Sequence, residues 1–299
     1  MSAICLSFPW DTQIGRNLAT ALGAAHGNVG IHRFPDGETL VRIEDDCAAK
    51  NVVLVCGGQN PNAGALPLYF AAHSARVMGA KSVGLVAPYL AYMRQDTVFH
   101  PGEAVSASAY GKFLSGIFDW IATVDPHLHR LKSLDEVFSI PAACVSSMPA
   151  VSDWIAANVT NPVIIGPDAE SAQWASSVAA RLGIPWTVLQ KTRTGDRRVS
   201  LSFPDGEILR GRSPVIVDDI ASSGHTLIEV AKRVRALSTG PVTCVVVHAL
   251  LEPGAEMAIR AAGVASFVST NTVTHASNGI DVVPLLGERI RATLRGMAS

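Results

Sequence analysis

The clearest chemical pattern in the sequence is a pair of adjacent carboxylates, Asp218 and Asp219, followed by hydroxyl residues and a glycine. An apolar run at 214–217 precedes the pair and a helical pattern at 225–237 follows it, which predicts a buried strand leading into a helix. The first turn of a helix offers unpaired N–H groups and the positive end of the helix dipole, so this segment can bind a phosphate. The candidate phosphate-binding residues are Ser222, Ser223, Gly224, His225 and Thr226.

The two carboxylates need a different partner from the phosphate, because like charges repel. We expect Asp218 and Asp219 to bind sugar hydroxyls or a Mg²⁺ ion, for which carboxylate oxygens are suitable ligands. The alternative is an ordinary capping turn after a buried strand, since Ser and Thr are common at helix N-termini. A plain cap needs one such side chain, so the adjacent acids favour a binding site.

Residues 33–43, RFPDGETLVRI, place an aromatic side chain beside two acceptors. Phe34 offers the aromatic face, and Asp36 and Glu38 are the acceptors. The alternative is a simple Pro-Asp-Gly turn, because this tripeptide is among the commonest turn signals.

Residues 87–114 leave a predicted strand and present several polar side chains before a helix that Ser106 is expected to cap. A solvated loop is the alternative to a binding role. The polar side chains of this segment are Arg94, Gln95, Asp96 and His100.

Asp125, His127 and His129 follow a third predicted strand, in TVDPHLH. The imidazoles could ligate a cation, although an H-x-H pair falls short of the three or four ligands of most zinc sites. A basic segment at 189–202 surrounds a glycine and predicts a mobile loop, or else a solvated surface cluster. The basic residues of this segment are Lys191, Arg193, Arg197 and Arg198.

Composition restricts the class of protein. The chain has 299 residues, of which 48% are hydrophobic and 16% charged, so it can bury a large core and is long enough for two domains. Its net charge is −1 and it has no Lys/Arg block, so the sequence does not indicate a basic surface that would bind nucleic acid or an anionic membrane. Its apolar runs are far shorter than the roughly 20 residues of a membrane helix.

The N-terminal sequence, MSAICLSFPWDTQIG, shows no secretory signal. Five scattered cysteines without C-x-x-C spacing are typical of reduced thiols, not of a disulfide framework or a zinc site. We therefore expect a soluble cytoplasmic protein.

Strand-like apolar runs alternate with helical patterns in both halves of the chain, which predicts an α/β fold with mostly parallel sheets. Each half has the pattern of one doubly wound unit, and the predicted domains are 1–148 and 149–299. Ligands of such sheets bind at the carboxyl ends of the strands, where Asp125, Asp168 and the 218–219 pair fall. Neither a G-x-x-x-x-G-K-[ST] loop nor a G-x-G-x-x-G motif is present, so ATP would have to bind in another way.

These motifs, in their order, resemble the ribose-phosphate pyrophosphokinase family over nearly the whole chain. The segments are RFPDGE, PYLAYMRQD with PGEAVSA, TVDPH, GPDAES, QKTR and VDDIASSGHT. The last alone would indicate the wider phosphoribosyltransferase superfamily. HPGEAVS and Ser222 are more similar to the archaeal members of the family.

The resemblance implies two similar phosphoribosyltransferase-type domains, a homo-oligomer, and transfer of the diphosphoryl group of ATP to the C1 hydroxyl of ribose 5-phosphate. It implies that the 218–219 carboxylates bind the sugar and that residues 222–226 hold the 5-phosphate. His127 and Asp168 match the family's Mg²⁺–ATP ligands, and Lys191 and Arg193 match residues that close over the transferring phosphates. The residues implied for ATP are Phe34, Asp36, Glu38, Arg94, Gln95 and Asp96.

The sequence departs from the family pattern at Thr97, Glu170, Ser171, Ser222 and Asn271. Thr97 replaces a common arginine, and Glu170 adds a charge beside the expected Mg²⁺ site. Two alternative functions therefore stay open. One is a phosphoribosyltransferase that consumes the activated sugar, and the other is a catalytically silent regulatory subunit.

Overall fold

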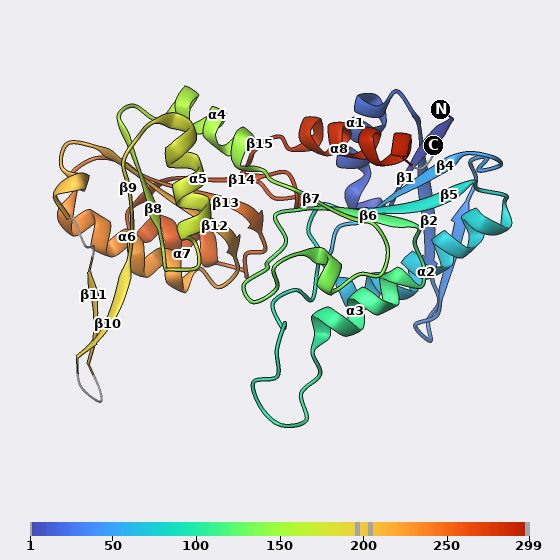
Figure 1. The fold of residues 1–299 in the computed structure, drawn as a ribbon, viewed down its shortest axis with the longest axis horizontal. Coiled ribbons are helices and arrows are strands. Elements are labelled where there is room, and N and C mark those ends of the chain that lie inside the picture. Colours follow the sequence, from blue (N-terminus) through green and yellow to red (C-terminus); the bar gives the residue numbers. More distant parts are fainter. Residues whose placement is uncertain (1, 195–197, 203–205, 297–299) are drawn as a thin grey trace. The chain divides into compact units, whose positions relative to one another are not determined.

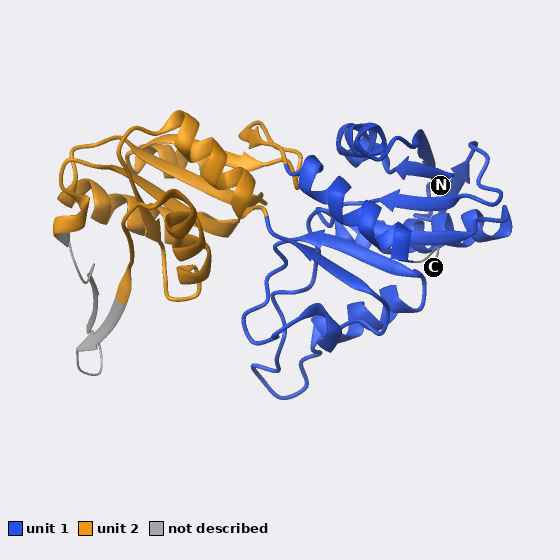
Figure 2. Ribbon diagram, turned by 45° about the horizontal axis from the view of Figure 1, so that its top comes forward, with its two compact units in different colours: residues 1–146, 282–299 blue, residues 147–281 orange. Residues whose placement is uncertain are grey.

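The fold is that of a computed structural model, which describes residues 2–194, 198–202 and 206–296, with side chains described for 2–190 and 207–296. The described chain divides into two compact units (Figure 2), one of residues 1–146 with 282–299 and one of residues 147–281. Each unit is an α/β sheet covered by helices on both faces (Figure 1). The fold class predicted from the sequence is confirmed.

The first unit is built on a sheet in the order β3-β2-β1-β4-β5-β6-β7, in which β2 and β3 are antiparallel and the other described pairs are parallel. In Figure 1, α1 and α8 cover one face and α2 and α3 the other. Its elements are β1 (Ala3–Ser7), α1 (Thr12–Leu22), β2 (Ala25–Arg33), β3 (Thr39–Ile43), β4 (Asn51–Val55), α2 (Pro61–Val77), β5 (Ser82–Ala87), α3 (Ser106–Ser115), β6 (Trp120–Val124), β7 (Ala142–Val145) and α8 (Val283–Gly296).

The second unit is built on a parallel sheet in the order β15-β14-β13-β12-β8-β9, with α4 and α5 on one face and α6 and α7 on the other (Figure 1). Strands β10 and β11 form a separate antiparallel pair. Its elements are α4 (Met148–Asn158), β8 (Pro162–Gly166), α5 (Ala172–Leu182), β9 (Trp186–Val188), β10 (Gln190–Thr194), β11 (Arg198–Ser202), β12 (Ser213–Ala221), α6 (His225–Leu237), β13 (Val242–Ala249), α7 (Ala255–Ala261), β14 (Val264–Thr270) and β15 (Asn278–Ile280).

The two sheets repeat one topology. The order β2-β1-β4-β5-β6-β7 of the first unit matches β9-β8-β12-β13-β14-β15 of the second. The additions differ: β3 pairs antiparallel with β2 in the first unit, whereas a separate antiparallel hairpin of β10 and β11 follows β9 in the second. In the first unit the chain goes from β1 to β2 on one side and then to β4 on the other side of β1. In the second unit it goes from β8 to β9 and then to β12 on the other side of β8. Each sheet therefore has a topological switch point, between β1 and β4 or between β8 and β12. Ligands bind α/β sheets at such points.

The central strands are continuous apolar runs because helices bury both faces of each sheet. Every residue of β4, β5, β6 and β13 is buried. These fully buried strands therefore form the centres of the two hydrophobic cores.

The last helix, α8, belongs to the first unit. The domain boundary predicted from the sequence places it in the second domain, residues 149–299. Helix α8 packs on α1, and the Arg291 guanidinium donates a hydrogen bond to the carbonyl of Ala21. Its buried residues, among them Leu286 and Ile290, form the apolar stripe that makes this contact possible. None of the described helices has an apolar stretch long enough to span a bilayer.

Candidate functional site

The loop from β12 to α6 leads into a helix whose first turn has no side-chain cap in the described structure. Helix α6 begins at His225, and its N-cap is Gly224, so no side chain caps the first turn in the described structure. The backbone donors of that turn are therefore available to a ligand. The turn is therefore not capped by its own side chains, and phosphate binding stays a prediction for it.

Gly224 is required by the loop conformation, since its φ of 76° lies in the left-handed region. A Cβ at this position would lie 2.9 Å from the side chain of Ile259. The loop is also tied to the end of β13, because the N–H of Glu252 donates to the Ser222 carbonyl at 3.1 Å. The Ser223 hydroxyl and the His225 Nδ1 lie 2.9 Å apart. Residues 222–226 therefore form one fixed turn.

Asp218 and Asp219 lie within β12, which continues to Ala221, so the acids belong to the strand and not to the loop after it. Asp219 is 5% exposed, and its N–H donates to Asp218 Oδ1 at 3.1 Å. Burial, and then the charges of Asp219 and Asp168, raise the pKa of Asp218 well above its usual value. Three carboxylates thus gather at the β8–β12 switch point.

Asp168 follows β8 and is held by the start of α5. Its Oδ1 accepts the N–H groups of Glu170 and Ser171, each at 3.0 Å, and the buried Ser171 hydroxyl donates to the Asp168 carbonyl at 2.7 Å. Ser171, a departure from the family pattern, therefore fixes the backbone of Asp168 through its hydroxyl, while its N–H donates to the carboxylate. Among the described residues, both hydrogen bonds to the Asp168 carboxylate are accepted by Oδ1.

In the first unit, residues 34–38 form the turn between β2 and β3. The N–H of Phe34 donates to the Glu38 carbonyl at 2.8 Å, and Asp36 Oδ1 accepts the Glu38 N–H at 3.1 Å. The Phe34 ring is 40% exposed and rests edge-to-face on His32 with 4.7 Å between ring centroids. The turn therefore presents an aromatic ring on a supported hairpin.

The segment 94–96 makes several contacts within its own unit. Arg94 is exposed, whereas Gln95 Oε1 accepts the hydroxyl of Ser106 at 2.6 Å at the start of α3. Asp96 accepts hydrogen bonds from both the N–H and the guanidinium of Arg130. Sequence reasoning did not single out Arg130, because nothing in the sequence pairs it with Asp96.

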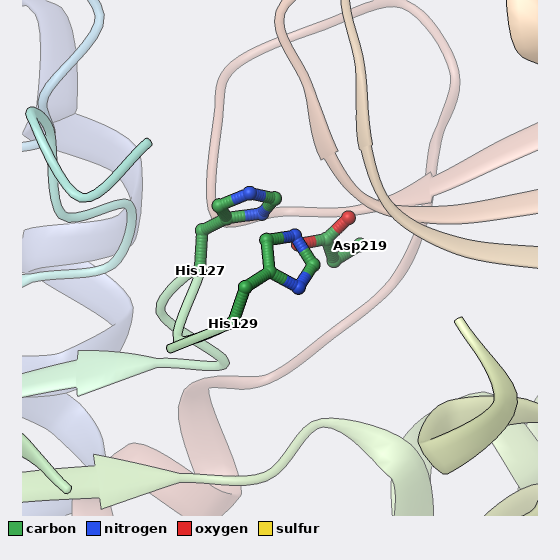
Figure 3. Close-up of side chains that lie close together, drawn as sticks. All are labelled: His127, His129 and Asp219. Atoms are coloured by element: carbon green, nitrogen blue, oxygen red, sulfur yellow. The ribbon is translucent and has the colours of Figure 1, made fainter. Parts of the chain in front are cut away.

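His127 and His129 lie on the loop after β6, and their rings are perpendicular with centroids 3.7 Å apart (Figure 3). The loop begins at Asp125, which is 8% exposed and has a φ of 32°, an uncommon value for a residue other than glycine. Asp219, also drawn in Figure 3, belongs to the second unit. The H-x-H spacing therefore does bring the two imidazoles together.

Lys191 and Arg193 belong to β10, which pairs antiparallel with β11. Their side chains lie outside the described part of the structure, and Arg197 lies outside the described residues.

Comparison with known proteins covers both units. The N-terminal domain of ribose phosphate pyrophosphokinase matches residues 5–117, and the phosphoribosyl transferase domain matches residues 134–279. A ribose-phosphate pyrophosphokinase of Methanopyrus kandleri is 32% identical over 96% of this chain and 98% of its own. The chain belongs to the ribose-phosphate pyrophosphokinase family. A second relative, ribose-phosphate pyrophosphokinase 2 of Archaeoglobus fulgidus, is 32% identical over 94% of this chain and 98% of its own.

The fold agrees with this family. The crystal structure of phosphoribosylpyrophosphate synthetase from Mycobacterium smegmatis matches with a TM-score of 0.86, covering 99% of this chain and 100% of that chain at 20% identity. Among the departures from the family pattern, Asn271 donates to Asp281 Oδ1 at 2.6 Å, so it has a local structural partner. Nothing in the described structure explains Thr97.

Proposed function

We propose that the chain is a ribose-phosphate diphosphokinase, which transfers the diphosphoryl group of ATP to the C1 hydroxyl of ribose 5-phosphate. The single observation that carries this proposal is the gathering of Asp168, Asp218 and Asp219 at a switch point beside the uncapped first turn of α6. That arrangement suits a ligand with a phosphate at one end and hydroxyls at the other. ATP, the second substrate, is inferred from the family to which the chain belongs.

In the proposed complex, residues 222–226 hold the 5-phosphate through backbone N–H groups and hydroxyls. Asp218 and Asp219 accept hydrogen bonds from the sugar hydroxyls and orient O1. The O1 oxygen attacks the β-phosphorus of ATP, the bond from that phosphorus to the oxygen bridging the α-phosphorus breaks, and AMP leaves. The C1 hydroxyl proton passes to solvent.

The ATP side of the proposal rests on the first unit and on β10. Phe34, with Asp36 and Glu38, would contact the base. The segment of Arg94, Gln95 and Asp96 would lie nearer the base and phosphates. Lys191 and Arg193 would neutralise the charge of the transferring group, since phosphoryl transfer depends mainly on positioning and charge stabilisation.

The donor chemistry of the candidate metal ligands can be tested against Mg²⁺. Asp168 offers a carboxylate, which suits this hard cation, whereas the His127 imidazole is a better ligand for softer divalent ions. We propose Asp168 and His127, each in its own unit, as residues that bind the Mg²⁺ of Mg²⁺–ATP. Bound there, the ion would reduce the negative charge of the nucleotide phosphates.

The two alternatives are less well supported. A phosphoribosyltransferase would not need a first unit that matches the N-terminal domain of the pyrophosphokinase. A silent regulatory subunit would be free to lose the chemistry-bearing residues, whereas Lys191, Arg193, His127 and Asp168 are all present.

We also propose that the protein is a cytoplasmic homo-oligomer. The outward face of α2 carries Leu66, Tyr69, Phe70 and Val77 at helical spacing, with exposures of 60%, 43%, 37% and 74%. The face lacks acidic residues, and Arg76 is the one cation of α2, so two copies can meet on it with little like-charge repulsion. Exposed apolar stripes of this kind mark protein interfaces. The free cysteines fit a reducing compartment.

The experiment that tests the proposed function is product analysis after incubation with Mg²⁺, ATP and ribose 5-phosphate. We expect AMP and 5-phosphoribosyl 1-diphosphate in equal amounts. Formation of ADP would indicate simple kinase chemistry, and absence of turnover would favour the regulatory subunit.

A further inference from the structure

Asp96 binds one residue of the histidine loop twice. Its Oδ1 accepts the Arg130 guanidinium at 2.7 Å, and its Oδ2 accepts the Arg130 N–H at 3.2 Å. Both carboxylate oxygens are therefore engaged by Arg130. The carboxylate thus fixes both the backbone and the side chain of Arg130.

In this ion pair the Asp96 side chain is buried, whereas the Arg130 side chain is exposed. The Asp96 side chain is 1% exposed, whereas that of Arg130 is 54% exposed and its guanidinium carbon lies 5.4 Å from the centre of the Phe99 ring. Burial alone would raise the pKa of Asp96, but the hydrogen bonds and charge of Arg130 lower it overall. Asp96 is thus held ionised and fixed in place.

Two further contacts fix the same loop. At its start, the N–H of Asp125 donates to the Val145 carbonyl at 3.0 Å. In its middle, Leu128 packs against the hydrophobic core of the first unit. With Leu128 turned inward, its two neighbours in sequence, His127 and His129, lie together with ring centroids 3.7 Å apart (Figure 3). Asp96 provides the third anchor, at the end of the loop.

We propose that Asp96 is a positioning residue, which holds residues 125–130 in one conformation and thereby keeps the two imidazoles paired for binding a divalent cation. The part that concerns the cation rests on the proposed function, whereas the pairing of the rings does not. Residues that orient metal ligands commonly change metal affinity by about 10–100-fold when they are replaced.

The chain offers a matched control at the other end of β6. Asp119 also accepts one backbone N–H, from Val83 at 2.7 Å, and one guanidinium, from Arg76 at 3.0 Å. It lies before β6, whereas the histidine loop follows that strand. Asp119→Asn therefore removes an equivalent carboxylate without touching the loop.

The first measurement uses the protein without metal or nucleotide. In NMR spectra with the imidazole signals assigned, the wild type is expected to show a nuclear Overhauser effect between the rings of His127 and His129. Asp96→Asn and Arg130→Gln should lose it, and Asp119→Asn should keep it. Retention of the effect in both loop variants would overturn the proposal, whether or not the chain is an enzyme.

The second measurement is the Mg²⁺ concentration that gives half-maximal formation of AMP. We expect Asp96→Asn to raise it by about tenfold and Asp119→Asn to change it less than twofold. An equal rise in both variants would indicate a general loss of stability and would contradict the positioning role. If the wild type forms no AMP, the proposed function fails, and the ring measurement still decides the positioning.

Discussion

Asp168 follows β8 and Asp218 lies in β12, the neighbouring parallel strand, and the charge of Asp168 acts on the Asp218 carboxyl at this edge of the sheet. Burial and the charge of Asp219 raise the pKa of Asp218, and the charge of Asp168 raises it further. The two residues are distant in sequence, but the strand pairing that joins Ile165 to Ile216 brings them together. This edge of the second unit is the centre of the proposed sugar site.

Replacing Gly224 should weaken sugar binding. Gly224→Ala introduces a Cβ 2.9 Å from Ile259 at a φ of 76°, so we expect a stability loss of roughly 1–2 kcal/mol. Because the same turn is proposed to hold the phosphate, the Kd for ribose 5-phosphate should rise by about tenfold in calorimetry.

The matched control for this prediction is Gly211→Ala. Gly211 has a φ of 65° but has no neighbouring atom within 4 Å of an added Cβ among the described residues. It should lose stability from backbone strain alone and bind the sugar normally. Equal loss of binding in both variants would remove the phosphate role from the turn at Gly224.

Lys191→Ala should separate catalysis from sugar binding. Loss of a cation that stabilises the transferring phosphates is expected to lower turnover by about 10³-fold. Binding of ribose 5-phosphate, measured by calorimetry, should stay nearly unchanged. Lys232→Ala, which removes an exposed lysine of α6, should leave both quantities unchanged. A comparable loss of sugar binding in Lys191→Ala would show that this lysine serves the sugar site.

Asp11 should make the stability of the protein depend on pH. This side chain is 3% exposed, and burial raises its pKa to about 6, although the Gly57 N–H donates to it at 2.6 Å. The folded state therefore binds a proton more tightly than the unfolded state. The Asp11 contribution to stability is complete below about pH 4 and is lost as the pH rises through about 6, by roughly 2–3 kcal/mol.

Asp11→Asn should remove this dependence. In urea unfolding, the variant is expected to exceed the wild type in stability at pH 8 and to match it near pH 4. Asp153→Asn, at an exposed ion pair with Arg181, is the control and should change the stability at pH 8 by less than about 1 kcal/mol. A variant that is less stable than the wild type at pH 8 would show that ionised Asp11 stabilises the fold.

A charge on the outward face of α2 should dissociate the proposed oligomer. Tyr69→Glu places a carboxylate in the apolar stripe, and we expect a smaller mass in light scattering coupled to gel filtration. Met257→Glu, at a residue that is 72% exposed in the second unit, should keep the wild-type mass. A monomeric wild type, or a Tyr69→Glu variant of unchanged mass, would rule out this interface.

Much of the fold could be predicted because burial on both faces makes parallel strands visible as apolar runs. The apolar run at 214–217 lies within β12 (Ser213–Ala221), and the predicted helix at 225–237 coincides with α6. The return of α8 to the first unit was missed, because nothing in its own sequence names the helix on which it packs.

The side-chain contacts of the candidate site were less predictable. The contact of Asp96 with Arg130, on a different loop, left no signal in the sequence, and the role of Asp96 toward ATP stays a prediction. The sequence marked Ser171 as a departure from the family pattern but did not indicate that its hydroxyl bonds the Asp168 carbonyl. Such contacts depend on tertiary structure and leave no periodic signal in the sequence.

The most direct test of the central claim follows the β-phosphorus of ATP. With ATP labelled at that atom, Mg²⁺ and ribose 5-phosphate, we predict that the label appears in 5-phosphoribosyl 1-diphosphate while unlabelled AMP is released in equal amount. Recovery of the label in ADP would contradict diphosphoryl transfer.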